Sequence, residues 1–216
     1  MNDLRRPPRH YTYIDHGASI YVESFATIRR EANLGGIPAD AEKIAVRMVH
    51  GSGQVDLVPD LVIHPGLAPA ARLALSTGAP ILADARMVAM GITAGRLSAE
   101  NDVLCFLNDE RVPGLAAAWS TTRTAAAVSL WEPHLEGAVV AIGNAPTALF
   151  HLLEMLIAGA PRPAAIVGCP VGFIGAAESK AALIQDNPVP WCVVEGRPGG
   201  SAMTVAAVNA LASARE

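Results

Sequence analysis

The sequence predicts an α/β fold: a single domain with a mainly parallel β-sheet and helices on both faces. From residue 61 to the end of the chain, short apolar runs alternate with segments of helical pattern. The runs are continuously apolar, which is typical of parallel strands that are covered on both faces. The 216 residues show no break in composition and no internal repeat, so we expect one domain over residues 13–216.

A first helix is expected over residues 17–33, before the sheet. Residues 1–12 are polar and rich in Pro and Arg, and we expect them to form a flexible arm. Asp15 can cap the helix, and Gly35 with Gly36 ends it. The residues expected on the buried side of this helix are Ile20, Phe25 and Ile28.

A second helix is expected from about Pro38 to Gly51. Its apolar residues share one side at helical spacing: Ala41, Ile44, Ala45, Met48 and Val49. Lys43, Arg47 and His50 stand at i, i+4 and i+7, so we expect them to form a line on a different side. A histidine in line with two cations suits an acid that acts on an anionic substrate. The alternative is a solvated face with a histidine that ends a helix.

The remaining elements follow from the apolar runs and from Gly and Pro at their ends. The expected strands are residues 61–63, 80–84, 103–107, 138–142, 164–167 and 191–194. The expected helices are residues 65–77, a short one around Met87, and residues 120–131, 146–158, 176–185 and 201–212. The two helices before residue 61 must then pack on a face or on the top edge of this sheet.

Composition and charge narrow the class of protein. Apolar residues make up 51% of the chain and charged residues 17%, which favours a covered sheet and a buried subunit interface. The net charge is −4 without a long basic run, which argues against nucleic acid as the main partner. Cys105, Cys169 and Cys192 lie far apart in the sequence, so we expect no disulfide framework, no zinc site and a cytoplasmic location. Neither a signal peptide nor a membrane-spanning run is expected.

Three expected strand-to-helix turns are rich in Gly and small residues: residues 142–147, 168–175 and 196–202. In a parallel sheet, ligands bind outside the carboxyl ends of the strands. Backbone N–H groups at helix starts favour anions, so these turns could form a rim for several negative groups. The alternative is that the glycines only permit tight turns. The Gly-x-Gly-x-x-Gly and Gly-Lys-Ser/Thr motifs of nucleotide sites are not present.

Other polar residues have a structural and a functional interpretation. Arg123 could bind a carboxylate through two parallel N–H groups, or it could be a surface arginine or pair with an acid. Asp84 ends a strand, and we expect it to cap a helix, with a place on the rim as the alternative. Glu178 and Lys180 are expected to be solvated at the start of a helix. Three further histidines are expected to be structural: His64, His134 and His151.

Seven ordered segments together carry a resemblance to a known family: Tyr21-Val22-Glu23-Ser24-Phe25, Arg47-Met48-Val49-His50, Thr122-Arg123-Thr124-Ala125-Ala126, Ala141-Ile142-Gly143-Asn144-Ala145-Pro146-Thr147-Ala148-Leu149, Pro170-Val171-Gly172-Phe173, Ala176-Ala177-Glu178-Ser179-Lys180 and Gly199-Gly200-Ser201-Ala202. In this order they resemble the precorrin-8X methylmutase family of cobalamin biosynthesis, from about Tyr13 to Leu211. The arm before Tyr13 is outside the pattern, and Pro198 stands where members often carry a basic residue.

The resemblance implies an isomerase that needs no cofactor and no metal. It implies conversion of precorrin-8X to hydrogenobyrinic acid by migration of a methyl group from C-11 to C-12 of the tetrapyrrole. It also implies a homodimer with substrate at the subunit interface, and a proton donor at the position of His50. The residues expected to contact the substrate are Ser24, Arg47, Arg123, Asn144 and Thr147. We therefore expect His50 to face a cavity bordered by residues 143–147.

Three alternatives stay open from the sequence. A tetrapyrrole carrier would bind the corrin product without turning over the precorrin. The cobalt-precorrin-8 methylmutase of the anaerobic route is a related enzyme, which acts on the cobalt-bearing substrate. A nucleotide-binding α/β protein is the third, although the motifs give it little support.

Overall fold

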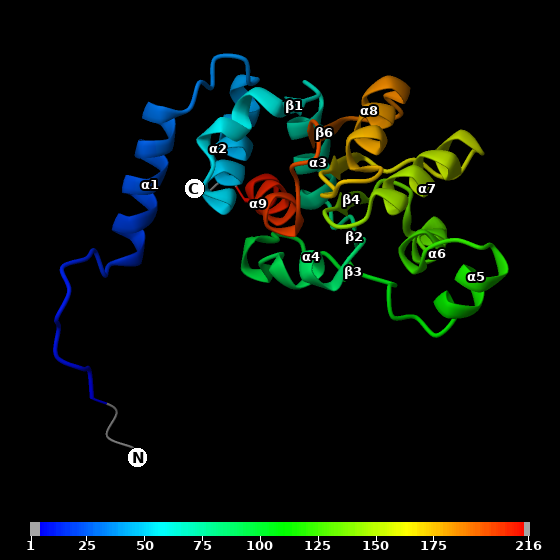
Figure 1. Ribbon diagram of the computed structural model, residues 1–216, viewed down its shortest axis with the longest axis horizontal. Coiled ribbons are helices and arrows are strands. Elements are labelled where there is room, and N and C mark those ends of the chain that lie inside the picture. The colour runs from blue at the N-terminus through cyan, green and yellow to red at the C-terminus, as the bar shows by residue number, and fades with distance from the viewer. Residues whose placement is uncertain (1–4, 214–216) are drawn as a thin grey trace.

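The computed structural model describes residues 5–213, whose strands form one six-stranded sheet in the order β1-β6-β5-β4-β2-β3 (Figure 1). The strands are β1 (Leu61–Ile63), β2 (Ile81–Ala83), β3 (Val103–Leu104), β4 (Val139–Ile142), β5 (Ala165–Gly168) and β6 (Trp191–Val194). All neighbours from β6 to β3 run parallel, and β1 pairs antiparallel with β6 at the edge, with Leu61 opposite Val194. The predicted α/β fold with a mainly parallel sheet is confirmed.

The helices surround this sheet and extend beyond it. They are α1 (Gly17–Glu31), α2 (Glu42–Ser52), α3 (Leu67–Ser76), α4 (Arg86–Gly91), α5 (Val112–Ala118), α6 (Arg123–Ser129), α7 (Pro146–Ile157), α8 (Ala176–Asp186) and α9 (Ser201–Ala212). Short 3-10 turns lie at Ala39–Ala41, Val55–Asp60, Ala94–Arg96 and Glu132–His134.

Two hydrophobic cores lie on opposite faces of the sheet. Because successive side chains of a strand point to opposite faces, Val139 and Ala141 of β4 join one core and Val140 and Ile142 join the other. Helices α3 and α9 cover the first face, with α2 packed on the outer side of α9, and α7 and α8 cover the second. Figure 1 shows α1 on the far side of α2, away from the sheet. The prediction of helices on both faces is confirmed.

Two predicted boundaries around the edge strand are wrong. The predicted strand over residues 103–107 ends at Leu104, because its partner β2 is itself short and pairs only Ile81 with Val103 and Leu82 with Leu104. The predicted helix over residues 120–131 is shorter and begins at Arg123, where the Thr122 hydroxyl accepts a hydrogen bond from the Ala125 amide. A separate helix, α5, precedes it and was not expected.

The start of α1 also differs from the prediction. Asp15 does not cap the helix; its carboxylate pairs with Arg6 at 2.6 Å and with Arg9 at 3.3 Å in the preceding segment. Phe25 and Ile28 are buried as expected, but Ile20 is 44% exposed. The reason is that α1 packs mainly on α2, so only a narrow side of it is covered.

Candidate functional site

His50 stands in the last turn of α2 and is exposed. Its Nδ1 atom lies 2.8 Å from the Ser24 hydroxyl oxygen of α1. The rings of Tyr21 and Phe25, also from α1, lie with their centroids 5.5 and 5.2 Å from the imidazole centroid. Because Nδ1 is engaged by Ser24, Nε2 is the ring nitrogen that can act on a ligand.

A surface depression of about 340 Å³ lies beside His50. Its lining residues come from α1 and α2 and the turn after α2: Glu23, Ser24, Thr27, Ile28, Glu31, Val49, His50, Gly53 and Val55. His50 therefore does not point into packed hydrocarbon. Residues 143–147 are not among those that line this depression.

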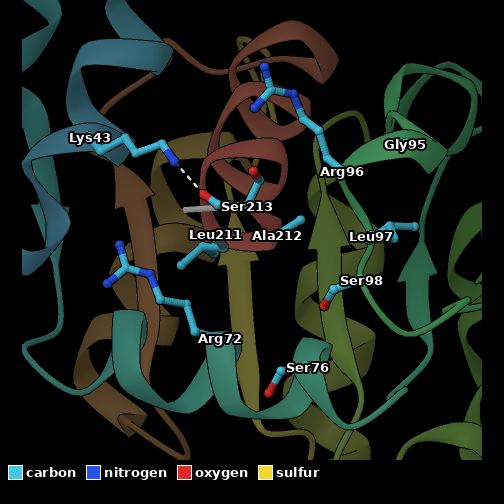
Figure 2. Close-up of a pocket in the computed structure, with 10 residues that line it drawn as sticks. All are labelled: Lys43, Arg72, Ser76, Gly95, Arg96, Leu97, Ser98, Leu211, Ala212 and Ser213. Atoms are coloured by element: carbon cyan, nitrogen blue, oxygen red, sulfur yellow. Dashed lines mark hydrogen bonds between the residues drawn. The ribbon is translucent and has the colours of Figure 1, made fainter. Parts of the chain in front are cut away.

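The expected line of Lys43, Arg47 and His50 is divided among three environments. Arg47 is buried, with its guanidinium carbon 5.2 Å from the Phe25 ring centroid. Lys43, near the other end of α2, donates a hydrogen bond to the Ser213 carbonyl. Figure 2 shows this lysine at a separate pocket of about 730 Å³ with Arg72 and Arg96. The three residues do share one side of α2, as their spacing predicts, but Phe25 of α1 covers Arg47, so they do not form one solvated line.

The turn before α7 binds an internal carboxylate. Asp84 accepts hydrogen bonds from the amides of Gly143 at 2.9 Å, Asn144 at 2.9 Å and Ala145 at 2.8 Å. Burial raises the pKa of Asp84 above its usual value, against the opposite effect of these three bonds. The N–H groups expected to hold substrate anions at this turn are thus already occupied, and Asp84 caps this turn and not the helix that follows it in sequence.

Arg123, Asn144 and Thr147 lie together at the starts of α6 and α7. The hydroxyls of Thr147 and Thr122 are 2.8 Å apart and join the two helices. Arg123 donates to the Leu107 carbonyl at 3.2 Å and to Oδ1 of Asn108 at 3.4 Å. All three residues of this group are exposed, so they are accessible to a ligand.

The beginning of α9 separates this group from His50. Gly51 is so close to α9 that a Cβ atom on it would lie 3.3 Å from Cβ of Ala206. A Cβ atom on Gly143 would lie 2.6 Å from the Thr204 hydroxyl on the same helix. The predicted site residues therefore form two clusters in one chain, one around His50 and one around Thr147.

The remaining polar candidates have structural partners. His64 Nδ1 accepts from the Gly66 amide at 3.0 Å, the His134 ring stacks on Phe106, and His151 Nε2 lies 2.6 Å from the Ser129 hydroxyl. The three cysteines are free thiols, as predicted. Within residues 5–213, no group of three or more His, Cys, Asp or Glu side chains is placed to hold a metal ion. In the same part of the chain, every helix is too short or too polar to cross a membrane.

Comparison with known proteins identifies the family. A family model described as precorrin-8X methylmutase matches residues 19–214. The chain belongs to the precorrin-8X methylmutase family. It is an isomerase of cobalamin biosynthesis.

Relatives match this methylmutase-family chain over almost its whole length. It is 62% identical to the precorrin-8X methylmutase of Pseudomonas aeruginosa, covering 94% of this chain and 99% of the relative. The chain is 57% identical to the precorrin-8X methylmutase of a Sinorhizobium species, and this match covers 94% of this chain and 97% of the relative. The cobalt-precorrin-8 methylmutase of Priestia megaterium is 35% identical, and this match covers 88% of this chain and 84% of the relative. A crystal structure of precorrin-8X methylmutase from Thermus thermophilus has a TM-score of 0.82 and 40% identity, covering 91% of this chain and 95% of the other.

Sequence reasoning missed two structural features, one at the candidate site and one in a buried lysine. Tyr21, Ser24 and Phe25 face His50 together, and their spacing of three and four residues on α1 was the available signal. Lys180 was expected to be solvated, but it is fully buried and donates to the Pro198 carbonyl at 2.6 Å. Sequence reasoning could not detect this, because the carbonyl belongs to a loop 18 residues away.

Proposed function

We propose that this member of the methylmutase family converts precorrin-8X to hydrogenobyrinic acid, with His50 as the general acid. The observation that carries the proposal is the pairing of Ser24 with Nδ1 of an exposed imidazole, which directs Nε2 outward. Nε2 gives its proton to the ring system, the methyl group moves from C-11 to C-12, and a proton then leaves the ring. Because substrate and product are isomers, His50 must recover one proton in each cycle.

Ser24 suits the acid form of His50. A hydroxyl oxygen can accept a hydrogen bond from Nδ1–H of the charged imidazolium. It also fixes the plane of the ring, since α1 and α2 are held together by the Phe25 side chain between them. The rings of Tyr21 and Phe25 give the imidazole an apolar border, which helps to exclude water from the proton transfer.

Five residues are proposed to hold the substrate. Ser24 orients His50 at the reacting part of the ring, and Arg123, Asn144 and Thr147 offer exposed donors to peripheral carboxylates. Arg47 is buried behind Phe25, so we expect it to act through its positive charge. No metal and no cofactor enters this proposal, because protonation and an intramolecular shift need a donor and a shaped surface.

A homodimer would unite the two clusters. The cluster around His50 and the cluster around Thr147 are separated by α9 in one chain, so a second copy would have to supply one of them. Large exposed side chains on α1 and just before it support this: Tyr13, Ile14, Ile20, Tyr21 and Val22. We also propose a cytoplasmic location and a flexible arm over residues 1–12, of which residues 1–4 lie outside the described part.

The metal-free substrate is favoured over cobalt-precorrin-8. Identity to the two precorrin-8X methylmutases is 62% and 57%, against 35% to the cobalt-precorrin-8 methylmutase of Priestia megaterium. The chain is thus closer to the enzymes named for the metal-free substrate than to the one named for the cobalt form.

The test is an absorbance spectrum of the protein mixed with precorrin-8X and followed over time. We expect conversion to hydrogenobyrinic acid of unchanged mass, which chromatography and mass spectrometry verify. Tight binding of hydrogenobyrinic acid without any conversion would instead identify a carrier. A parallel reaction with cobalt-precorrin-8 should be slower, and conversion of that form alone would contradict the metal-free assignment.

A further inference from the structure

Two loops at the carboxyl end of the sheet are joined backbone to backbone. The β5–α8 loop is residues 169–175, and the β6–α9 loop is residues 195–200. The Gly200 amide donates to the Cys169 carbonyl at 2.8 Å, and the Gly172 amide donates to the Arg197 carbonyl at 3.3 Å. The loops touch so closely that a Cβ atom on Gly199 would lie 2.5 Å from the Cys169 carbonyl oxygen.

The β5–α8 and β6–α9 loops together are called the double loop here. Lys180 holds this double loop from inside the fold. It has no exposed surface, and its Nζ atom donates to the Pro198 carbonyl at 2.6 Å. Burial lowers the pKa of Lys180 from its usual value, because an ammonium group loses hydration inside a protein. An apolar side chain of similar length would avoid that loss, so stability alone does not account for a lysine here.

The outer side of the double loop carries an aromatic ring and a cation. Phe173 is 83% exposed and Ile174 is 89% exposed. The guanidinium carbon of Arg197 lies 5.2 Å from the Phe173 ring centroid. Large apolar side chains on a rim are typical of ligand surfaces, and a guanidinium beside them can bind a carboxylate.

The double loop is connected through α9 to the helix end that carries His50. The β6–α9 loop leads into Ser201, the first residue of α9. One residue later, the Ala202 carbonyl oxygen would lie 3.5 Å from a Cβ atom on Gly51, the neighbour of His50. The β6–α9 loop and the end of α2 therefore contact the same first turns of α9.

We propose that Phe173 and Arg197 bind one face and one carboxylate of the tetrapyrrole, and that Lys180 is the buried positioning residue of this surface. The inference rests on the proposed function for the identity of the ligand. The role of Lys180 in holding the loops can be measured without any ligand.

The first experiment compares Lys180→Met with Lys43→Met in the full chain. Both lysines donate to a backbone carbonyl, but Lys43 does so at the pocket shown in Figure 2, away from the double loop. In Lys180→Met we expect amide hydrogen exchange at Gly172 and Gly200 to accelerate about tenfold, with a melting temperature close to the parent's. Lys43→Met should leave both amides unchanged. Equal exchange in the parent and Lys180→Met would overturn the positioning role.

The second experiment measures the binding of hydrogenobyrinic acid and steady-state conversion of precorrin-8X. We expect Phe173→Ala and Arg197→Gln each to raise the Kd about tenfold, since both contacts are with bound ligand. Lys180→Met should raise KM about fivefold or more and leave kcat within about twofold, the signature of lost uniform binding. Leu73→Ala, which removes an exposed apolar side chain on α3, is the control and should change nothing.

The outcomes separate this inference from the proposed function. A parent that converts precorrin-8X while Phe173→Ala and Arg197→Gln retain the parental Kd overturns the binding surface and leaves the function standing. A parent that binds no tetrapyrrole refutes both the function and the binding surface. The hydrogen-exchange comparison still decides the role of Lys180 in that case.

Discussion

The hydroxyl oxygen of Ser24 lies 2.8 Å from Nδ1 of His50 and joins α1 to the last turn of α2. The orientation of the proposed acid is thus set by a helix other than its own. Any movement of α1 on α2 would rotate or release the imidazole. Because α1 packs mainly on α2, this contact depends on the packing of that one pair of helices.

Removing the Ser24 hydroxyl should slow the reaction. We expect Ser24→Ala to lower kcat about tenfold or more, since a hydrogen bond to a charged group contributes about 1.5–3 kcal/mol. Ser24→Thr keeps a hydroxyl and should recover part of the rate. The control is Ser52→Ala. Ser52 lies in the same last turn of α2 as His50, but its hydroxyl donates to the Val49 carbonyl and not to His50. The kcat of all three variants is measured from steady-state conversion of precorrin-8X. A Ser24→Ala kcat equal to the parent's would show that the contact does not contribute to catalysis.

The Asp84 carboxylate should be required for the turn before α7. Asp84→Asn replaces one acceptor oxygen by an NH₂ group, so at least one of the three amides loses its partner, at a cost of about 1–3 kcal/mol. Asp102→Asn is the control, because Asp102 is an exposed acid at the protein surface. Urea unfolding at pH 7 should show a clear loss for Asp84→Asn and little change for Asp102→Asn. Equal stability of the two variants would contradict the capping role.

His151 should make the fold less stable in mild acid. Burial lowers the pKa of His151, against a smaller opposite effect of Glu154. The unfolded chain therefore takes up this proton at higher pH than the folded chain does. Stability is lost as the pH falls from about 6.5 toward the lowered pKa. We expect the difference in unfolding free energy between pH 7.5 and pH 5.5 to shrink in His151→Gln. An identical pH dependence in the parent and the variant would exclude His151 as its source.

The sequence predicted the elements that depend on local pattern. The strands β4, β5 and β6 and the helices α7 and α9 agree within one or two residues, because each is a continuous apolar run or begins at a Pro or directly after a Gly. Helix α5 was not predicted, because Pro113 and Gly114 in its first turn are residues typical of loops. The length of the edge strand β3 was overestimated, because it is set by the short partner strand β2.

The site was predictable only in part, for a physical reason. Helical spacing pointed to His50, the family resemblance added Ser24, and the fold brings these two together. The amides of Gly143 to Ala145 looked available from their own sequence, but the carboxylate that occupies them comes from Asp84, 59 residues before the first of them. Tertiary contacts of this kind decide which polar groups remain for a ligand, and local pattern does not contain them.

The central claim is tested most directly by His50→Asn. Asparagine keeps a polar side chain next to Ser24 but cannot donate a proton to the ring as an acid. Conversion of precorrin-8X should fall at least about 100-fold, because general acid catalysis contributes roughly that much, while hydrogenobyrinic acid still binds with the parental Kd. A His50→Asn enzyme that converts precorrin-8X at a rate within a few fold of the parent's would contradict the account.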